Sequence, residues 1–209
     1  MRTIVKGPEP ATLTQHRQRK CADYENYEDK VALRAALVAE QRGLCCYCQS
    51  RIRPTADSMK IEHWQCQTAH PARQLDYANL HAACLGGECQ PEHLQHCDTK
   101  KANTSLCFSV SDQAHPVEQK TRFLGDGRIS AHDAAIAGEL ESVLNLNLPR
   151  LVSNRKAVLD AFHRRLRNAR RVDPSRELPR WDGTLDGDLP EFAQVVVYWL
   201  RKRLARESV

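Results

Sequence analysis

Seven of the nine cysteines in this 209-residue chain lie between residues 45 and 97. The seven are Cys45, Cys46, Cys48, Cys66, Cys84, Cys89 and Cys97. Cysteines gathered in this way are typical of metal sites in a reducing compartment and of disulfides in an oxidising one. Cys21 and Cys107 stand apart, and we expect them to be ordinary buried or free thiols. How the cluster is interpreted therefore depends on the compartment.

The sequence has no segment that is expected to carry it into or across a membrane. Its mean hydropathy is −0.59, and no apolar run approaches the roughly 20 residues of a membrane span. Residues 1–7 lack the apolar run of about 7–15 residues that a signal peptide contains. We therefore expect a cytoplasmic protein without a membrane partner, in which the cysteines bind metal.

The spacing of the cysteines predicts one structural zinc site. Cys45 and Cys48 have the Cys-x2-Cys spacing that lets two thiolates reach one tetrahedral zinc ion at about 2.3 Å. A closed site needs a second pair, and we expect it to be Cys84 and Cys97, which flank a long insertion. The insertion also holds alternative ligands, namely Cys89, His93 and His96. In a further alternative, the cysteines are only small buried residues.

The elements around this stretch follow the order strand, loop, strand, helix. A helix over residues 29–42 has carboxylates at its start and Gly43 after its end. Strands are expected at 59–64 and 80–84, joined by a loop or a short helix, and another helix begins at Cys97. This order is a ββα outline that can hold one catalytic metal ion.

The last 90 or so residues are expected to be mainly helical. Gly125-Asp126-Gly127 lies between the segments 117–123 and 128–130 and predicts a hairpin. After the hairpin we expect a helix from residue 131, a helix at 151–172, a linker at 174–187 and a helix at 189–206.

The net charge of +5 falls in the C-terminal region. Residues 1–150 hold 18 basic and 18 acidic residues, whereas residues 151–209 hold 13 basic and 8 acidic ones. Such an excess can attract a polyanion such as nucleic acid, or it can be a solvated helix face.

A second kind of chemistry lies inside the cysteine-rich stretch, because Glu62 and His63 are neighbours at the end of the first strand. Hydrolysis of a phosphodiester needs an activated water and stabilisation of negative charge. A neutral histidine can take the proton from water, and a divalent cation held by carboxylates can stabilise the charge. Asn79 can hold the loop of His63 by hydrogen bonds, and Asp98 can supply a second oxygen ligand.

The order Cys-x2-Cys, Glu-His, Asn-Leu, Cys and Cys-Asp-x-x-Lys resembles the HNH endonuclease family. Those proteins use a ββα-metal centre, often with a zinc knuckle. The resemblance implies that His63 is the general base and that Glu62 is a ligand of Mg²⁺ or a similar divalent ion. Asn79 matches the middle asparagine of the family motif.

The third position of that motif departs from the family pattern. Asp98 stands where the family usually has His or Asn, so His96 and Asn103 remain alternative ligands. Lys101 matches the basic residue of the closing helix, and the resemblance implies that it contacts phosphate.

Longer stretches resemble the PtuB-type HNH effectors of Septu anti-phage systems, some of which are attached to retrons. These stretches are residues 1–10, 43–48, 59–64, 83–87 and 143–149. The resemblance implies an obligate partner, a PtuA-like SMC/ABC ATPase that holds the nuclease until infection. We therefore expect a defence nuclease that cuts nucleic acid, DNA in preference to RNA. The alternatives are the same site acting on RNA, such as tRNA, and a non-catalytic zinc-finger adaptor.

The expected fold class is α+β, mainly helical, with a central zinc-stapled ββα-metal (HNH) motif and a β-hairpin. We expect three parts: an N-terminal arm at 1–28, an HNH nuclease core with a zinc knuckle at 29–110, and a hairpin with a C-terminal helical region at 111–209.

Overall fold

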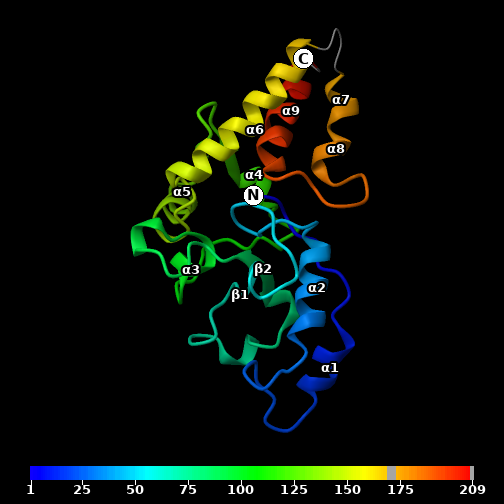
Figure 1. Cartoon of the computed structure of the whole chain (residues 1–209), viewed down its shortest axis with the longest axis vertical. Coiled ribbons are helices and arrows are strands. Elements are labelled where there is room, and N and C mark those ends of the chain that lie inside the picture. Colours follow the sequence, from blue (N-terminus) through cyan, green and yellow to red (C-terminus); the bar gives the residue numbers. More distant parts are fainter. Residues whose placement is uncertain (169–172, 208–209) are drawn as a thin grey trace.

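Helix α2 (Lys30–Glu40) packs against β2 (Leu80–Cys84), which pairs with β1 (Met59–His63), in the lower half of the molecule in Figure 1. The computed structural model describes residues 1–168 and 173–207. Over these residues the chain is an α+β fold with two small antiparallel sheets, in agreement with the predicted class. The helices that follow the second sheet form the upper half of the molecule in Figure 1.

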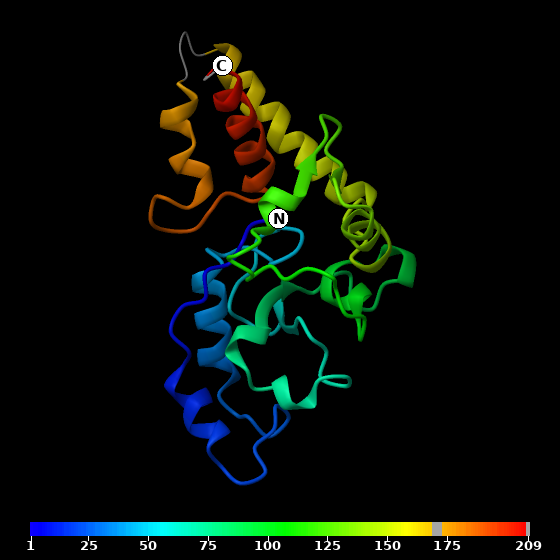
Figure 2. The same ribbon diagram turned by 180° about the vertical axis from the view of Figure 1, so that it is seen from behind.

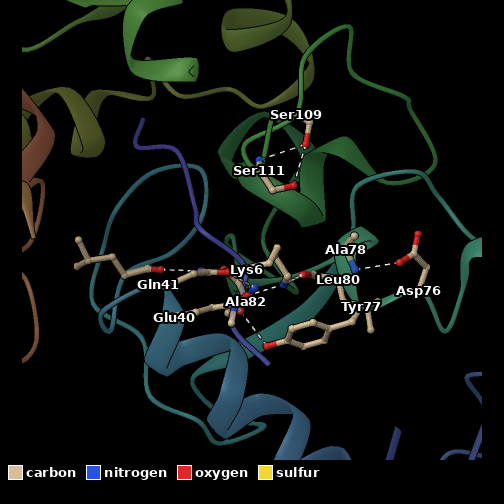
Figure 3. Close-up of polar contacts among 12 residues, drawn as sticks. Lys6, Glu40, Gln41, Asp76, Tyr77, Ala78, Leu80, Ala82, Ser109 and Ser111 are labelled. Atoms are coloured by element: carbon tan, nitrogen blue, oxygen red, sulfur yellow. Dashed lines mark hydrogen bonds and ion pairs between the residues drawn. The ribbon is translucent and has the colours of Figure 1, made fainter. Parts of the chain in front are cut away.

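Helix α2 has the predicted cap and stop residues, but it ends two residues before the predicted end at residue 42. The carboxylate of Asp29 accepts a hydrogen bond of 3.1 Å from the backbone N–H of Ala32, which caps the first turn. After Glu40 the helix gives way to Gly43, whose φ of +74° suits a glycine. The amide of Gln41 then bonds both the N–H and the carbonyl of Ala82 on β2, at 2.7 and 2.8 Å (Figure 3). These two bonds fix the helix against the sheet.

Strands β1 and β2 are antiparallel, with Met59 opposite Cys84 and His63 opposite Leu80. Helix α3 (Cys97–Lys101) packs against β2, so the predicted strand–strand–helix order is confirmed. The register places the end of β1 against the start of β2, beside α3. Short 3-10 turns lie in the connections, at η1 (Pro71–Arg73), η2 (Tyr77–Asn79) and η3 (Glu92–Leu94).

The segment predicted as an extended arm, residues 1–28, contains a helix, α1 (Ala11–Arg17), and is fastened to the sheet. Lys6 forms an ion pair with Glu40, donates to the carbonyl of Leu80 at 2.8 Å, and lies 3.9 Å from the ring centroid of Tyr77 (Figure 3). The phenol of Tyr77 in turn donates to Glu40 at 2.8 Å. A buried polar network therefore ties the arm to α2 and β2.

The second sheet is the predicted hairpin, but it is shorter than expected. It pairs β3 (Thr121–Phe123) with β4 (Ile129–Ala131). The first part of the predicted strand is instead a helical turn, α4 (Val117–Lys120), which follows Pro116 and is closed by the hydroxyl of Thr121 donating to the carbonyl of Val117.

The helix predicted from residue 131 begins later and has two parts. Residue 131 still belongs to β4, and α5 (Ala134–Gly138) starts after Asp133, whose carboxylate accepts from the N–H groups of Ala135 and Ile136. A π-helical turn, η4 (Glu139–Val143), follows directly.

The remaining helices correct the predicted boundaries. Helix α6 (Pro149–Asn168) begins two residues before the predicted start, and positions 169–172 of that prediction lie outside the described residues. The predicted linker contains two short helices, α7 (Pro174–Glu177) and α8 (Pro179–Asp182). In all three helices a proline occupies the first position, where its missing N–H costs nothing and its φ is already helical.

Helix α9 (Ala193–Glu207) begins four residues later than predicted. Phe192, immediately before it, has a φ of +54°, which lies in the left-handed region and bends the chain at the start of the helix. The N–H of Phe192 donates to the carbonyl of Gln49 at 3.0 Å, so this bend joins the last helix to the cysteine-rich stretch.

One cluster of buried apolar side chains extends from Met1 to Leu200 and includes residues of all three predicted parts. Met1, Phe123 and Phe192 surround one small cavity at the middle of the molecule, where both views place the N-terminus (Figures 1 and 2). Within the described residues, no helix combines the length and the apolar character that crossing a bilayer requires.

Candidate active site and metal centre

Four cysteine sulfurs converge where the knuckle, the turn at residues 45–50, meets β2 and α3. The Sγ atoms of Cys45, Cys48, Cys84 and Cys97 all lie within 4.8 Å of one another. The distance between Cys45 and Cys97 is 3.9 Å, and that between Cys48 and Cys84 is 3.7 Å. Four sulfurs at about 2.3 Å from a tetrahedral zinc ion stand about 3.8 Å apart. The predicted set is therefore brought together, and its spacing fits a metal ion such as zinc.

The local chain geometry explains how the knuckle presents its two thiols. The backbone turns between Cys45 and Ser50, with the N–H of Cys45 donating to the Ser50 carbonyl at 3.0 Å. Gln49 completes the turn with a φ of +66°. Cys84 is the last residue of β2 and Cys97 the first of α3, so two separate elements supply the second pair.

The other candidates for zinc ligands in the insertion do not join this cluster. Cys89 is exposed, and so is His93. His96 is buried, but its Nδ1 lies 3.1 Å from the sulfur of Cys97, which is a hydrogen-bond distance to a ligand. His96 therefore contacts one of the four clustered cysteines from outside the cluster.

The thiols also perturb one another. Burial raises the pKa of the Cys97 thiol well above its usual range. Burial acts in the same direction on Cys45, but hydrogen bonds from neighbouring thiols outweigh it and hold the pKa of Cys45 well below its usual range. A metal ion removes this conflict, because it binds the cysteines as thiolates.

Glu62 lies in a buried polar site next to the four-cysteine cluster. Its side chain is 1% exposed, and its Oε1 accepts a hydrogen bond of 2.6 Å from the phenol of Tyr47. The ammonium of Lys101 lies 2.9 Å from the same oxygen. Burial raises the pKa of Glu62 well above its usual range, and the adjacent carboxyl of Asp98 raises it further. Two carboxyl groups held together in this way favour a shared proton or a bound cation.

His63 is held in one orientation by its loop. Its Nε2 lies 3.0 Å from the carbonyl of Gln74. The side-chain nitrogen of Gln67 lies 3.1 Å from Nδ1 and 3.3 Å from Nε2. Because a carbonyl only accepts, Nε2 carries the hydrogen, and the lone pair of the neutral ring is on Nδ1. The ring of Tyr24 packs edge to face against the imidazole, with 4.6 Å between the two ring centroids. Burial lowers the pKa of His63, which favours this neutral form.

Asn79 fastens the loop that carries those contacts. It is completely buried, and its amide donates to the carbonyls of Gln65 and Arg73 at 3.0 and 3.1 Å. Its oxygen accepts from the N–H of Gln65 at 2.8 Å. These bonds agree with the predicted role of Asn79 as the residue that holds the His63 loop.

A cleft of about 280 Å³ opens over these residues. Glu62, His63 and Asp98 all line it, and Asn103 lies at its wall whereas His96 does not. The cleft therefore separates the two alternatives for the third motif position, since His96 belongs to the cysteine centre.

The carboxylate oxygens in the cleft are of the type that binds a divalent cation, but the protein brings too few of them together to complete a site. Carboxylates such as Glu62 and Asp98 are the ligands that Mg²⁺ prefers, together with water. Among the described residues, only the four cysteines bring three or more His, Cys, Asp or Glu ligand atoms within 4.8 Å of one another. A cation here would depend on the two carboxylates, on Asn103 and on water, so the catalytic ion stays a prediction.

Lys101 occupies a different place from the one predicted for it. Its side chain is 1% exposed, and besides Glu62 it bonds the carbonyl of His63 at 3.0 Å. It does not line the cleft. The ammonium is therefore directed at the buried carboxylate and not at solvent, and these contacts give no support to a phosphate contact.

Tyr47 is the site residue that the sequence-based predictions missed. It is the only aromatic residue of the knuckle, between Cys46 and Cys48, and it is buried to 1% exposure. An aromatic hydroxyl placed among candidate metal ligands was the available signal, because a buried phenol needs a hydrogen-bond partner.

A scan against models of protein families and a search of curated proteins found no match to the chain.

Proposed function

We propose that this chain is a metal-dependent HNH endonuclease that hydrolyses phosphodiester bonds of nucleic acid, DNA in preference to RNA. The observation that carries the proposal is the cleft in which Glu62, His63 and Asp98 meet, next to four convergent cysteines. An acid–base residue and two oxygen ligands are parts that this reaction needs, and a structural metal ion on the cysteines would fasten the elements that carry them.

His63 is the general base in this proposal. Its Nε2–H is engaged by the carbonyl of Gln74, so Nδ1 is the atom that takes a proton from water. The oxygen of that water then bonds to phosphorus, the bond from phosphorus to the leaving oxygen breaks, and the leaving oxygen takes up a proton. The contact between Nδ1 and Gln67 must open to admit the water.

Glu62 and Asp98 would hold Mg²⁺ or a similar ion, which supplies charge stabilisation at the phosphate and the leaving oxygen. Tyr47 and Lys101 both bond Oε1 of Glu62, so they orient the carboxylate and leave Oε2 for the cleft. The four cysteines would hold structural Zn²⁺, which fastens the knuckle to β2 and α3.

The biological setting follows from the resemblance to PtuB-type effectors. We propose a cytoplasmic effector of anti-phage defence that acts in a complex with a PtuA-like SMC/ABC ATPase. The support is the sequence resemblance, which is spread from residue 1 to about residue 160.

The test compares the wild type with His63→Ala, each purified with the ATPase partner and incubated with plasmid, phage DNA or tRNA in Mg²⁺. We expect the wild type to cut DNA, and His63→Ala to lose about 10²-fold or more of the rate with its zinc content unchanged. His70→Ala is the matched control, because His70 lies in the same loop but does not line the cleft. Cleavage of tRNA alone would favour the RNase, and equal cutting by His63→Ala would refute the assigned mechanism. A zinc-loaded wild type that cuts nothing would favour the adaptor.

A further inference from the structure

His96 connects the four-cysteine centre to helix α6, which belongs to the C-terminal region. The histidine is 2% exposed. Its Nδ1 lies 3.1 Å from the sulfur of Cys97 and 4.0 Å from that of Cys84. On its other side, Nε2 contacts the guanidinium of Arg150, in the first turn of α6.

The chemistry of the three groups fixes the direction of these hydrogen bonds. A guanidinium has no lone pair to offer, so Arg150 donates and Nε2 of His96 accepts. The hydrogen of the neutral imidazole is then on Nδ1, and it points at the sulfur of Cys97. The result is a chain of donors from Arg150 through His96 to a metal-ligating thiolate.

A second arginine of α6, Arg155, is buried within the electrostatic influence of the four-cysteine cluster. Arg155 is 2% exposed, and it donates to the carbonyls of Gly127 and Leu146 at 2.6 and 2.7 Å. Over residues 1–168 and 173–207, the structure pairs it with no carboxylate. Burial lowers the pKa of Arg155 to about 10, and negative charge on Cys48 and Cys97 opposes that shift.

The charge of a loaded centre explains why such groups are needed. Four thiolates with one Zn²⁺ carry a net double negative charge, and a buried charge is costly unless it is paired or hydrogen-bonded. Groups that donate to ligating atoms orient them and strengthen metal binding. Here the compensating groups come from α6, a helix that supplies none of the four ligands.

We propose that Arg150 and His96 form a relay that holds zinc on the four cysteines and couples zinc binding to the docking of α6. The proposal rests on the proposed zinc centre. Because coupling between two events is reciprocal, loss of zinc weakens the docking of α6, and loss of the relay weakens the binding of zinc.

The test first measures zinc per chain in the purified wild type, by elemental analysis. A zinc-free wild type would refute the metal centre and the relay with it, whereas a zinc-loaded one allows the relay to be judged alone. Zinc affinity is then measured by competition with a chromogenic chelator for the wild type, His96→Phe, His96→Asn and Arg150→Met. His93→Phe and Arg164→Met are the matched controls, since both residues are exposed.

We expect His96→Phe to bind zinc about 10–100-fold more weakly. Arg150→Met is expected to fall between it and the wild type, and His96→Asn to retain more affinity than His96→Phe, because its amide places a donor near the position of Nδ1. Arg150 is exposed, so its variant is informative even where His96→Phe does not fold.

Hydrogen exchange at the amides of residues 151–156, in the first turns of α6, is expected to become faster in Arg150→Met and after zinc removal. Wild-type zinc affinity in Arg150→Met, or unchanged exchange after zinc removal, would overturn the proposal.

Discussion

Lys101 and Glu62 form an ion pair of 2.9 Å in which each side chain is only 1% exposed. The same ammonium bonds the carbonyl of His63, so one residue of α3 contacts two consecutive residues of β1. The phenol of Tyr47 completes the set from the knuckle. The carboxylate next to the proposed base is therefore held by two elements that the cysteines also join.

Replacement of Lys101 by methionine is expected to destabilise the fold by about 3–5 kcal/mol, because it leaves the buried Glu62 without its cation. Chemical denaturation of the zinc-loaded protein measures the change. Lys100→Met is the control, since Lys100 pairs with the exposed Glu92. A stable Lys101→Met protein with weaker nucleic-acid binding and a smaller salt dependence would instead indicate a phosphate contact.

Glu62 is expected to make stability fall with rising pH in Mg²⁺-free protein. Burial and Asp98 raise its pKa in the folded state above the usual value of about 4.3. Between those two values the folded state binds more protons than the unfolded state, so the free energy of unfolding decreases as pH rises. Denaturation from pH 4 upwards measures this slope, and Glu62→Gln should flatten it. An unchanged slope in the glutamine variant would mean that Glu62 is ionised without cost.

The cleavage rate is expected to fall only at low pH, where His63 becomes protonated. Burial lowers its pKa from the usual value of about 6.5, so the neutral base is already present below that pH. The rate of cleavage should therefore rise with pH around a midpoint below 6.5. Tyr24→Ala removes the ring that packs on the imidazole and should move the midpoint upwards. A wild-type midpoint above 6.5, or one that ignores Tyr24, would contradict this role of burial.

The sequence predicted the site best where ligands are set by spacing along the chain. Cys45 and Cys48 are local neighbours, and Cys84 and Cys97 stand at the ends of predictable elements, so their convergence needed only the ββα order. The position of the Lys101 side chain could not be predicted from spacing along the chain alone. Asp98 and Lys101 are three residues apart on α3 and therefore share a face of the helix. That face packs towards Glu62. A motif match alone does not reveal this packing.

The predicted starts of three helices were wrong for one shared reason. The predicted boundaries placed Pro149 before the helix at 151–172 and Pro174 and Pro179 in a linker, yet each proline occupies the first position of a helix. Proline ends a helix that precedes it and suits the start of one that follows. The choice between these roles depends on what the following residues pack against. Glu177 of α7, for example, is held by an ion pair to Arg165 of α6, which is a long-range contact.

Cys45→Ser is expected to lose zinc and folded stability together. Cys45 is 1% exposed at the centre of the sulfur cluster, and structural zinc contributes its binding free energy to folding. Zinc per chain and thermal unfolding measure both effects on one sample. Cys89→Ser is the matched control, because Cys89 lies in the nearby insertion but is exposed and outside the cluster. It should keep its zinc and its unfolding temperature. Zinc loss in Cys89→Ser with retention in Cys45→Ser would exchange their roles, and a folded, zinc-free Cys45→Ser protein would show that the metal is dispensable for the fold.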